Sequence, residues 1–238
     1  RGPMMGRIGS GSEPVTKTTN AILVLPQDHT IVTKKRRKAS IDLKRAASIC
    51  CQCRTCTDLC PRNNLGHPID PALFMRAASN QDFQDMNPYI NAAFCSSCGV
   101  CEMYSCPQSL APRTLLADMK AGLRKNGVRP PQGVQPAPVE ESREYRKVPE
   151  ERLMARLALT RYDKDAPLDD NVVPMSKVTI PLSQHIGAPA QAIVKVGDKV
   201  TAGQMIAAPA QGLSVGIHAS IDGTVTAVTD RQIVIVRK

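Results

Sequence analysis

The 238-residue sequence predicts an α+β fold in which a cysteine-rich helical domain precedes a small all-β domain. Two observations carry this prediction. All nine cysteines fall into two short clusters flanked by segments with helical patterns, whereas residues 177–238 consist of short runs rich in β-branched residues. A stretch rich in Pro and Gln separates the two parts, and the chain is long enough for two small domains.

Residues 1–38 are rich in Gly, Thr and Pro and end in the basic run KKRRK. One strand is expected here, at Ala21–Pro26 (AILVLP), because this is a short apolar run bounded by polar residues. The net charge is +10, and a basic chain of this kind attracts nucleic acid or other anions. Because aromatic side chains that could stack on bases are scarce, we expect no nucleic-acid partner. The basic run is then either solvated surface or compensation for an anionic group nearby.

Residues 39–127 hold both cysteine clusters and are predicted to be helical between and after them. Asp70 is suited to be an N-cap and Pro71 to be the first helical residue of PALFMRAASN. Pro112 opens a second helix, PRTLLADMKAGLRKNG, which has basic residues in its last turn and Gly127 placed to cap it.

Residues 128–176 are predicted to link the two domains. Their first part is rich in Pro, Gln and charge, which favours an extended connector, and a short helix is expected at Pro149–Leu159. From residue 177 onward, five runs (KVTIPL, QAIVKV, QMIAA, GTVTAV and QIVIV) alternate with turn residues. Several short strands at close spacing indicate a small barrel or sandwich. The β domain is predicted to span residues 177–238.

The first cysteine cluster, CCQCRTCTDLCP, has the spacing C-x2-C-x2-C-x3-C-P when it is read from Cys50. Bacterial-type ferredoxins use this run to hold a [4Fe–4S] cluster. The second cluster begins at Cys95 and has the spacing C-x2-C-x2-C-x4-C-P. In ferredoxins with two clusters, the fourth cysteine of each run ligates the other cluster. The predicted ligands are Cys50, Cys53, Cys56 and Cys106 for cluster 1, and Cys95, Cys98, Cys101 and Cys60 for cluster 2.

Cys51 fits no position in this frame, so we expect it to be a non-ligand packed in the interior as a small hydrophobic residue. Two zinc sites would also use eight thiols, but structural zinc sites usually pair CxxC motifs across longer loops. Zinc explains neither the third cysteine nor the proline that follows the fourth. Arg54 lies inside the first loop and is the candidate for tuning a reduction potential, because positive surroundings raise it. No catalytic residue is expected in this chain.

Three segments resemble RnfC-like electron-transfer flavoproteins: GPMMG (Gly2–Gly6), PVTKTTNAILVL (Pro14–Leu25) and CCQCRTCTDLCPRNNLGH (Cys50–His67). The third is similar to the PduS-type cobalamin reductases of propanediol-utilisation microcompartments. The resemblance implies that residues 1–38 are the tail of an upstream β-grasp domain. It also implies that residues 177–238 form a barrel-sandwich hybrid domain, similar to biotinyl and lipoyl carriers.

In the membrane-bound Rnf relatives the β domain comes before the ferredoxin part, so the order found here favours the microcompartment branch. The carrier domains bear a lysine on an exposed hairpin, but the corresponding stretch AQGLSVG (Ala210–Gly216) has none. We therefore expect no covalent cofactor on the β domain, which is predicted to be a docking module.

The resemblance implies electron transfer through two [4Fe–4S] clusters, as part of an NADH- and flavin-dependent reductase of cobalamin. FMN and NADH are expected to bind in a preceding half, because this chain has no strand followed by GxGxxG and a helix. The implied partners are cobalamin or a corrinoid-handling enzyme and the shell or lumen proteins of a bacterial microcompartment. The alternative is a non-catalytic conduit that passes electrons to a ferredoxin or shell partner.

No apolar run approaches the ~20 residues that span a bilayer. No segment has the charged start and apolar middle of a signal peptide. The sequence therefore predicts a cytoplasmic protein without a transmembrane segment.

Overall fold

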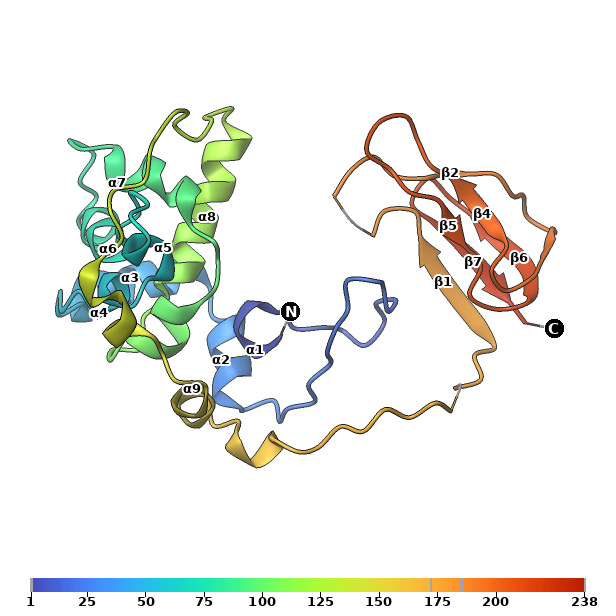
Figure 1. The fold of residues 1–238 in the computed structure, drawn as a ribbon, viewed down its shortest axis with the longest axis horizontal. Helices are drawn as coiled ribbons and strands as arrows, with labels where there is room; N and C mark the ends of the chain where they lie inside the picture. The colour runs from blue at the N-terminus through green and yellow to red at the C-terminus, as the bar shows by residue number, and fades with distance from the viewer. Residues whose placement is uncertain (1, 172, 185, 238) are drawn as a thin grey trace. The chain divides into compact units, whose positions relative to one another are not determined.

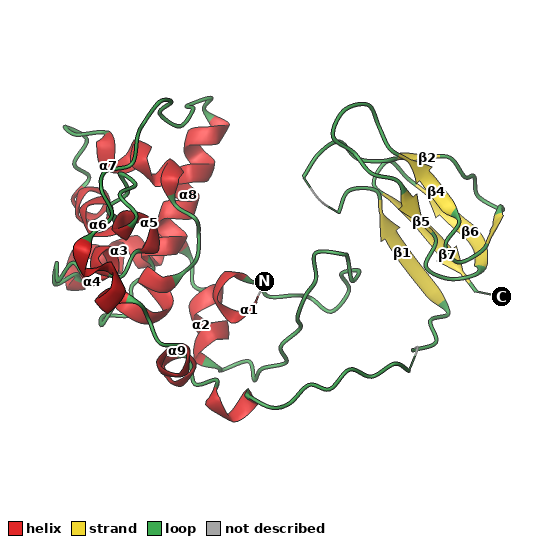
Figure 2. Cartoon of the chain, in the orientation of Figure 1, coloured by secondary structure: helices red, strands yellow, loops and turns green. Residues whose placement is uncertain are grey.

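The computed structural model describes residues 2–171, 173–184 and 186–237 (Figure 1). The chain divides into two compact units. The helical unit comprises Gly2–Ile8 and Leu23–Asp165, and the β unit comprises Gly9–Ile22 together with the chain from Ala166 onward. The N-terminal stretch is thus divided between the units. Every described helix lies in the helical unit and every described strand in the β unit (Figure 2).

The helical unit is built on three helices, α3, α6 and α8, that pack against one another. Its core contains the fully buried side chains of Phe74, Met75 and Leu116. Short 3-10 helices at Asn91–Phe94, Glu141–Arg146 and Thr160–Tyr162 and a π-helix at Cys101–Ser105 complete the unit. Its α-helices are α1 (Gly2–Met5), α2 (Thr30–Arg36), α3 (Ala39–Ile49), α4 (Thr55–Asp58), α5 (Pro61–Asn64), α6 (Pro71–Asn80), α7 (Asn87–Ile90), α8 (Pro112–Lys125) and α9 (Glu150–Arg156).

The two helices predicted from their terminal residues are confirmed. The Asp70 carboxylate caps α6 by accepting a hydrogen bond from the Leu73 N–H at 2.9 Å, and Pro71 is the first helical residue. Helix α8 begins at Pro112. It ends where Gly127 adopts a φ of +72°, a left-handed conformation that glycine reaches without steric penalty.

The strand predicted at Ala21–Pro26 is wrong, because these residues have no regular secondary structure. Ile22 and Val24 are 72% and 86% exposed, and all strands among the described residues lie beyond residue 176. A strand needs a neighbour to satisfy its backbone, and this run has none. The connector after α8 has no helix or strand over residues 128–140, but the prediction of an extended connector fails at Glu141–Arg146, which forms a 3-10 helix. The connector also bonds to the cysteine-rich region, since the Ala137 N–H donates to the Gly66 carbonyl at 2.9 Å.

The β unit consists of two antiparallel sheets, with strand orders β1-β7-β6-β3 and β2-β4-β5. Its core is aliphatic, with Ile206, Ile233 and Ile235 each 0% exposed, as a region without aromatic residues requires. Each of the five predicted runs contains a strand. The strands are β1 (Lys177–Pro181), β2 (Gln191–Ala192), β3 (Lys199–Val200), β4 (Met205–Ala208), β5 (Ile217–His218), β6 (Gly223–Val228) and β7 (Gln232–Val236).

Candidate iron–sulfur centres

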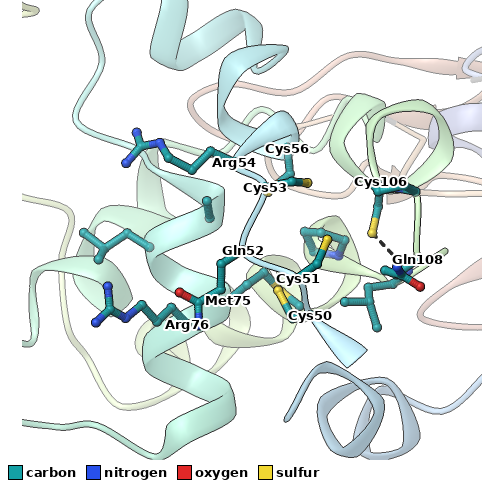
Figure 3. A pocket seen from close by; sticks show the side chains of 15 residues that line it. Cys50, Cys51, Gln52, Cys53, Arg54, Cys56, Met75, Arg76, Cys106 and Gln108 are labelled. Carbon is teal, nitrogen blue, oxygen red and sulfur yellow. Dashed lines mark hydrogen bonds between the residues drawn. The ribbon is translucent and has the colours of Figure 1, made fainter. Parts of the chain in front are cut away.

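The first group of cysteines surrounds a cavity of about 150 Å³ in the helical unit (Figure 3). Cys50 ends α3, Cys53 and Cys56 lie before and within α4, and Cys106 follows the π-helix. All four of these side chains line the cavity. Three therefore come from the first motif and one from the second.

The second group lines a smaller hollow in the same unit. Cys95 ends the 3-10 helix Asn91–Phe94, Cys98 follows in the loop, and Cys101 begins the π-helix. The fourth cysteine on this hollow is Cys60, which comes from the first motif and precedes α5. Of the eight cysteines that fit the two frames, each hollow thus gathers three of one motif and the last one of the other.

The two loops that carry the cysteines have the same backbone conformation. The residue before the second cysteine is left-handed in both, with φ of +53° at Gln52 and +58° at Ser97. The residue after it is left-handed as well, with φ of +61° at Arg54 and +87° at Gly99. Residues other than glycine seldom adopt this conformation, so its recurrence at matching positions shows that the two motifs are a structural repeat.

Burial and crowding make two of these thiols, Cys56 and Cys101, hard to ionise in the absence of a cation. Burial raises the pKa of Cys56 to about 12, and the neighbouring Cys106, Cys50 and Cys53 add to the effect. Burial and the nearby Cys98 also raise the pKa of Cys101. Since iron binds thiolates, a positively charged iron–sulfur core supplies the charge that such a set of donors needs. The residues present therefore fit two [4Fe–4S] clusters.

Hydrogen-bond donors point at three of the sulfur atoms. The Leu110 N–H donates to Cys106 Sγ and the Ser97 N–H to Cys95 Sγ, each at 3.3 Å. The Thr55 hydroxyl donates to Cys53 Sγ at 3.3 Å, and this bond lowers the pKa of Cys53. Donors of this kind stabilise negative charge on cluster sulfur atoms.

Cys51 is exposed, so the prediction that it packs in the interior is wrong. The first loop turns its residues 51–54 outward, and all four are exposed. Cys51 also lines the first cavity beside Cys50 (Figure 3). That it is not a ligand stays a prediction.

The basic run KKRRK is not simply solvated surface. Lys34 Nζ donates to the Glu102 carbonyl at 2.8 Å, Lys35 Nζ donates to the Gly6 carbonyl at 2.6 Å, and Arg37 reaches the Ser109 carbonyl. Partial burial lowers the pKa of both lysines. These side chains thus connect the basic run by hydrogen bonds to backbone segments near the second cysteine cluster and to the N-terminal segment.

Arg54 lines the first cavity, as its place in the motif implied. Its guanidinium also pairs with the Asp70 carboxylate at 3.2 Å. Because the Arg54 side chain is 62% exposed, this pair contributes little to stability. Its predicted effect on a reduction potential stays a prediction.

Sequence reasoning missed two buried polar residues, one directly after the third cysteine of each motif. Thr57 accepts a hydrogen bond from the Ala72 N–H at 2.8 Å, in the first turn of α6. Glu102 accepts one from the Thr114 N–H at 2.8 Å, in the first turn of α8. The sequence feature that could have revealed them is a polar residue directly after the third cysteine in both motifs. Each motif is therefore tied to the start of a core helix.

Within the described ranges, no three His, Cys, Asp or Glu side chains are close enough to bind a single metal ion. A zinc ion with Zn–S bonds of about 2.3 Å would hold its sulfur ligands about 3.8 Å from one another. A cubane is larger and holds its thiolates farther apart.

The described helices also include none that is both long and apolar enough to cross a membrane.

Two family models match the chain. The 4Fe-4S dicluster domain matches residues 49–111, a range that includes all eight predicted ligands, and the RnfC barrel sandwich hybrid domain matches residues 161–238. The predicted order of a dicluster domain followed by a barrel-sandwich hybrid domain is confirmed.

Curated relatives match almost the whole chain. It is 42% identical to cobalamin reductase PduS of Salmonella typhimurium, in an alignment 238 residues long that covers 99% of this chain and 52% of the relative. It is 39% identical to PduS of Citrobacter freundii, again over 99% of this chain and 52% of the relative. A shorter match, 52% identical over 54 residues, covers 23% of this chain and 12% of a component of the Na⁺-translocating ferredoxin:NAD⁺ oxidoreductase complex of Acetobacterium woodii.

The chain spans about half the length of the PduS relatives it matches. The two domain matches and the similarity along the whole chain agree with one another. The chain thus carries a 4Fe-4S dicluster domain followed by an RnfC barrel sandwich hybrid domain, and over almost its whole length it is similar to the PduS cobalamin reductases.

Proposed function

We propose that this chain holds two [4Fe–4S] clusters and is the electron-transfer region of an NADH- and flavin-dependent cobalamin reductase. The observation that carries the proposal is the sorting of eight cysteines into two hollows, each lined by four of them. When bound, each cluster supplies one-electron redox chemistry. The proposed ligands are Cys50, Cys53, Cys56 and Cys106 for cluster 1, and Cys95, Cys98, Cys101 and Cys60 for cluster 2.

The protein's own contribution is to hold the two clusters next to each other. Helix α4 leads from Cys56 in the first set to Cys60 in the second, and the π-helix leads from Cys101 in the second set to Cys106 in the first. These two connecting elements pack together. The pKa of Cys101 is raised in part by Cys56 of the other set, which supports a short separation. Single electrons can therefore cross this unit without a mobile carrier.

The rest of the proposal concerns the whole protein. The name of the PduS relatives supports cobalamin as the final acceptor. We infer that FMN and NADH bind outside this chain, that residues 1–38 follow a β-grasp domain, and that the enzyme works in the cytoplasm inside a microcompartment beside its shell or lumen proteins. The β unit would be a docking module, since Ala210–Gly216 contains no lysine for a prosthetic group.

The test is anaerobic reconstitution of the full-length protein with iron and sulfide. We expect NADH to bleach the cluster absorbance and added cobalamin to restore it. The 238-residue chain alone should be bleached by dithionite but not by NADH. Reoxidation by a ferredoxin but not by cobalamin would overturn the reductase function and leave an electron conduit. Bleaching of the chain alone by NADH would contradict the assignment of the nucleotide site to another region.

A further inference from the structure

A buried carboxylate close to the Cys106 loop has no role in holding a cluster. Asp42, in the first turn of α3, is 0% exposed. Its Oδ1 lies 2.9 Å from Arg37 Nε and 3.3 Å from Arg45 Nη1, and its Oδ2 accepts no hydrogen bond from the described residues. A buried charge is expensive unless it is paired, so this carboxylate holds two guanidinium groups in fixed positions.

Both guanidinium groups reach the same carbonyl oxygen. Arg37 Nη2 and Arg45 Nη1 each donate to the Ser109 carbonyl at 3.3 Å, and Arg45 Nη2 reaches the Gln108 carbonyl at 3.4 Å. Ser109 has a φ of +51°, which is unfavourable for a residue with a Cβ. The hydrogen bonds from the two arginines to its carbonyl stabilise the loop in this conformation.

The Ser109 carbonyl that accepts these bonds belongs to the same peptide unit as the Leu110 N–H, which donates to the sulfur of Cys106. The Ser109 C=O and the Leu110 N–H share one planar trans peptide, so they point in opposite directions. The Leu110 N–H donates to Cys106 Sγ at 3.3 Å, the bond drawn at Cys106 in Figure 3. Two cations on the oxygen aim the N–H at the sulfur and polarise it, because hydrogen bonds in a chain strengthen one another.

We propose that Arg37, Asp42 and Arg45 are positioning residues that raise the reduction potential of cluster 1 through the Leu110 N–H bond to Cys106. The inference rests on the proposed ligation of cluster 1 by Cys106. Reduction adds one electron to the cluster and its thiolates, so a stronger donor at sulfur stabilises the reduced state more than the oxidised state. The proposed ligands of cluster 2 do not include Cys106, so cluster 2 is the internal reference.

The decisive variant is Asp42→Ala in the reconstituted full-length protein. Loss of one negative charge would by itself favour reduction and raise the potential. Without the carboxylate, both arginines are free to move and the Leu110 N–H becomes a weaker donor, and this lowers the reduction potential of cluster 1. We expect the equilibrium ratio of reduced to oxidised cluster 1 to fall about tenfold at a fixed potential, a downward shift of about 59 mV for one electron.

The measurement is an anaerobic redox titration followed by electron paramagnetic resonance, in which the cluster 1 signal is the one that Cys106→Ala removes. Arg45→Lys is the second variant, since it keeps the charge but cannot reach both carbonyls; it should lower the ratio about threefold. Lys44→Gln is the matched control. It removes an exposed charge from the same helix and should change the ratio less than about twofold.

The outcomes separate this inference from the proposed function. Wild-type protein that binds no iron would refute the proposed clusters before any variant is compared. With about eight irons in the wild type, a raised or unchanged cluster 1 potential in Asp42→Ala would overturn the positioning role. If Asp42→Ala fails to fold, Arg45→Lys decides: an unchanged potential overturns the inference, and a lowered one supports it while Lys44→Gln stays near the wild-type value.

Discussion

The two cysteine loops have the same backbone and very different surroundings. In the first, residues 51–54 are all exposed, and the position after the second cysteine is occupied by Arg54. In the second, the matching residue is Gly99, which is buried. A Cβ at Gly99 would lie 3.4 Å from the Met4 carbonyl oxygen. The motif therefore sets the shape of a loop, while distant segments decide how much of it meets solvent.

The loops also differ by one residue before their last cysteine, and this residue changes the helix type. The first two residues after Cys56, Thr57 and Asp58, continue the α-helix α4, whereas the four residues after Cys101 form a π-helix. A π-helix is commonly the result of one residue inserted into a helical turn. Here the π-helix buries two successive side chains against different parts of the unit. Glu102 caps α8, and Met103 packs in a small core with Ile31.

The largest effect is expected from removal of the carboxylate that follows the third cysteine of the second loop. Glu102 is the side-chain cap of α8, whose N-cap residue Ala111 offers none. Glu102→Ala should lower the free energy of unfolding of the helical unit by about 2–4 kcal/mol. Thr57→Ala should lower it by about 1–2 kcal/mol, because α6 keeps its own cap, Asp70. Anaerobic urea unfolding measures both, and equal losses would contradict this difference between the loops.

A smaller effect is expected at the matching left-handed residues. Gly99→Ala introduces a Cβ at a φ of +87° beside the Met4 carbonyl and should destabilise the unit by about 1–2 kcal/mol. Arg54→Gly relieves a similar strain but loses an exposed ion pair, so its net effect should stay within about 1 kcal/mol. The thermal unfolding midpoint of each variant checks this. A Gly99→Ala protein as stable as the wild type would show that the left-handed backbone at this position does not require glycine.

The smallest effect is expected at the exposed cysteine of the first loop. Cys51→Ser should leave iron and sulfide at about eight each per chain, because Cys51 lies outside the repeated frame. Cys50→Ser, its neighbour within the frame, is the matched comparison and should lower both. A fall in iron content after Cys51→Ser alone would show that the frame is misread at this position.

Local signals in the sequence were sufficient for much of the fold. The starts of α6 and α8 follow from Asp70-Pro71 and Pro112, and the five β-rich runs each contain a strand. Caps and alternation act within a few residues, so the sequence alone reveals them. The strand predicted at Ala21–Pro26 failed because pairing depends on a partner, which an apolar run does not itself specify.

The candidate site was predictable in its ligands but not in its surroundings. Cysteine spacing picks out eight of the thiols that line the two hollows. It gives no sign that Cys51 is exposed, or that Arg37 and Arg45 meet at the Ser109 carbonyl. The arginine contacts join segments more than sixty residues apart in the chain. Spacing within a motif carries no information about them.

The central claim is that each cluster takes its fourth ligand from the other motif, and paired cysteine variants test it most directly. Cys50 and Cys106 line one cavity, so the double variant Cys50→Ala/Cys106→Ala should keep one cluster and about four irons per chain. Cys60 lines the other hollow, so Cys50→Ala/Cys60→Ala should lose both clusters and nearly all iron. Iron and sulfide analysis after anaerobic reconstitution gives the answer. The reverse pattern, with about four irons in Cys50→Ala/Cys60→Ala and almost none in Cys50→Ala/Cys106→Ala, would contradict the crossed ligation.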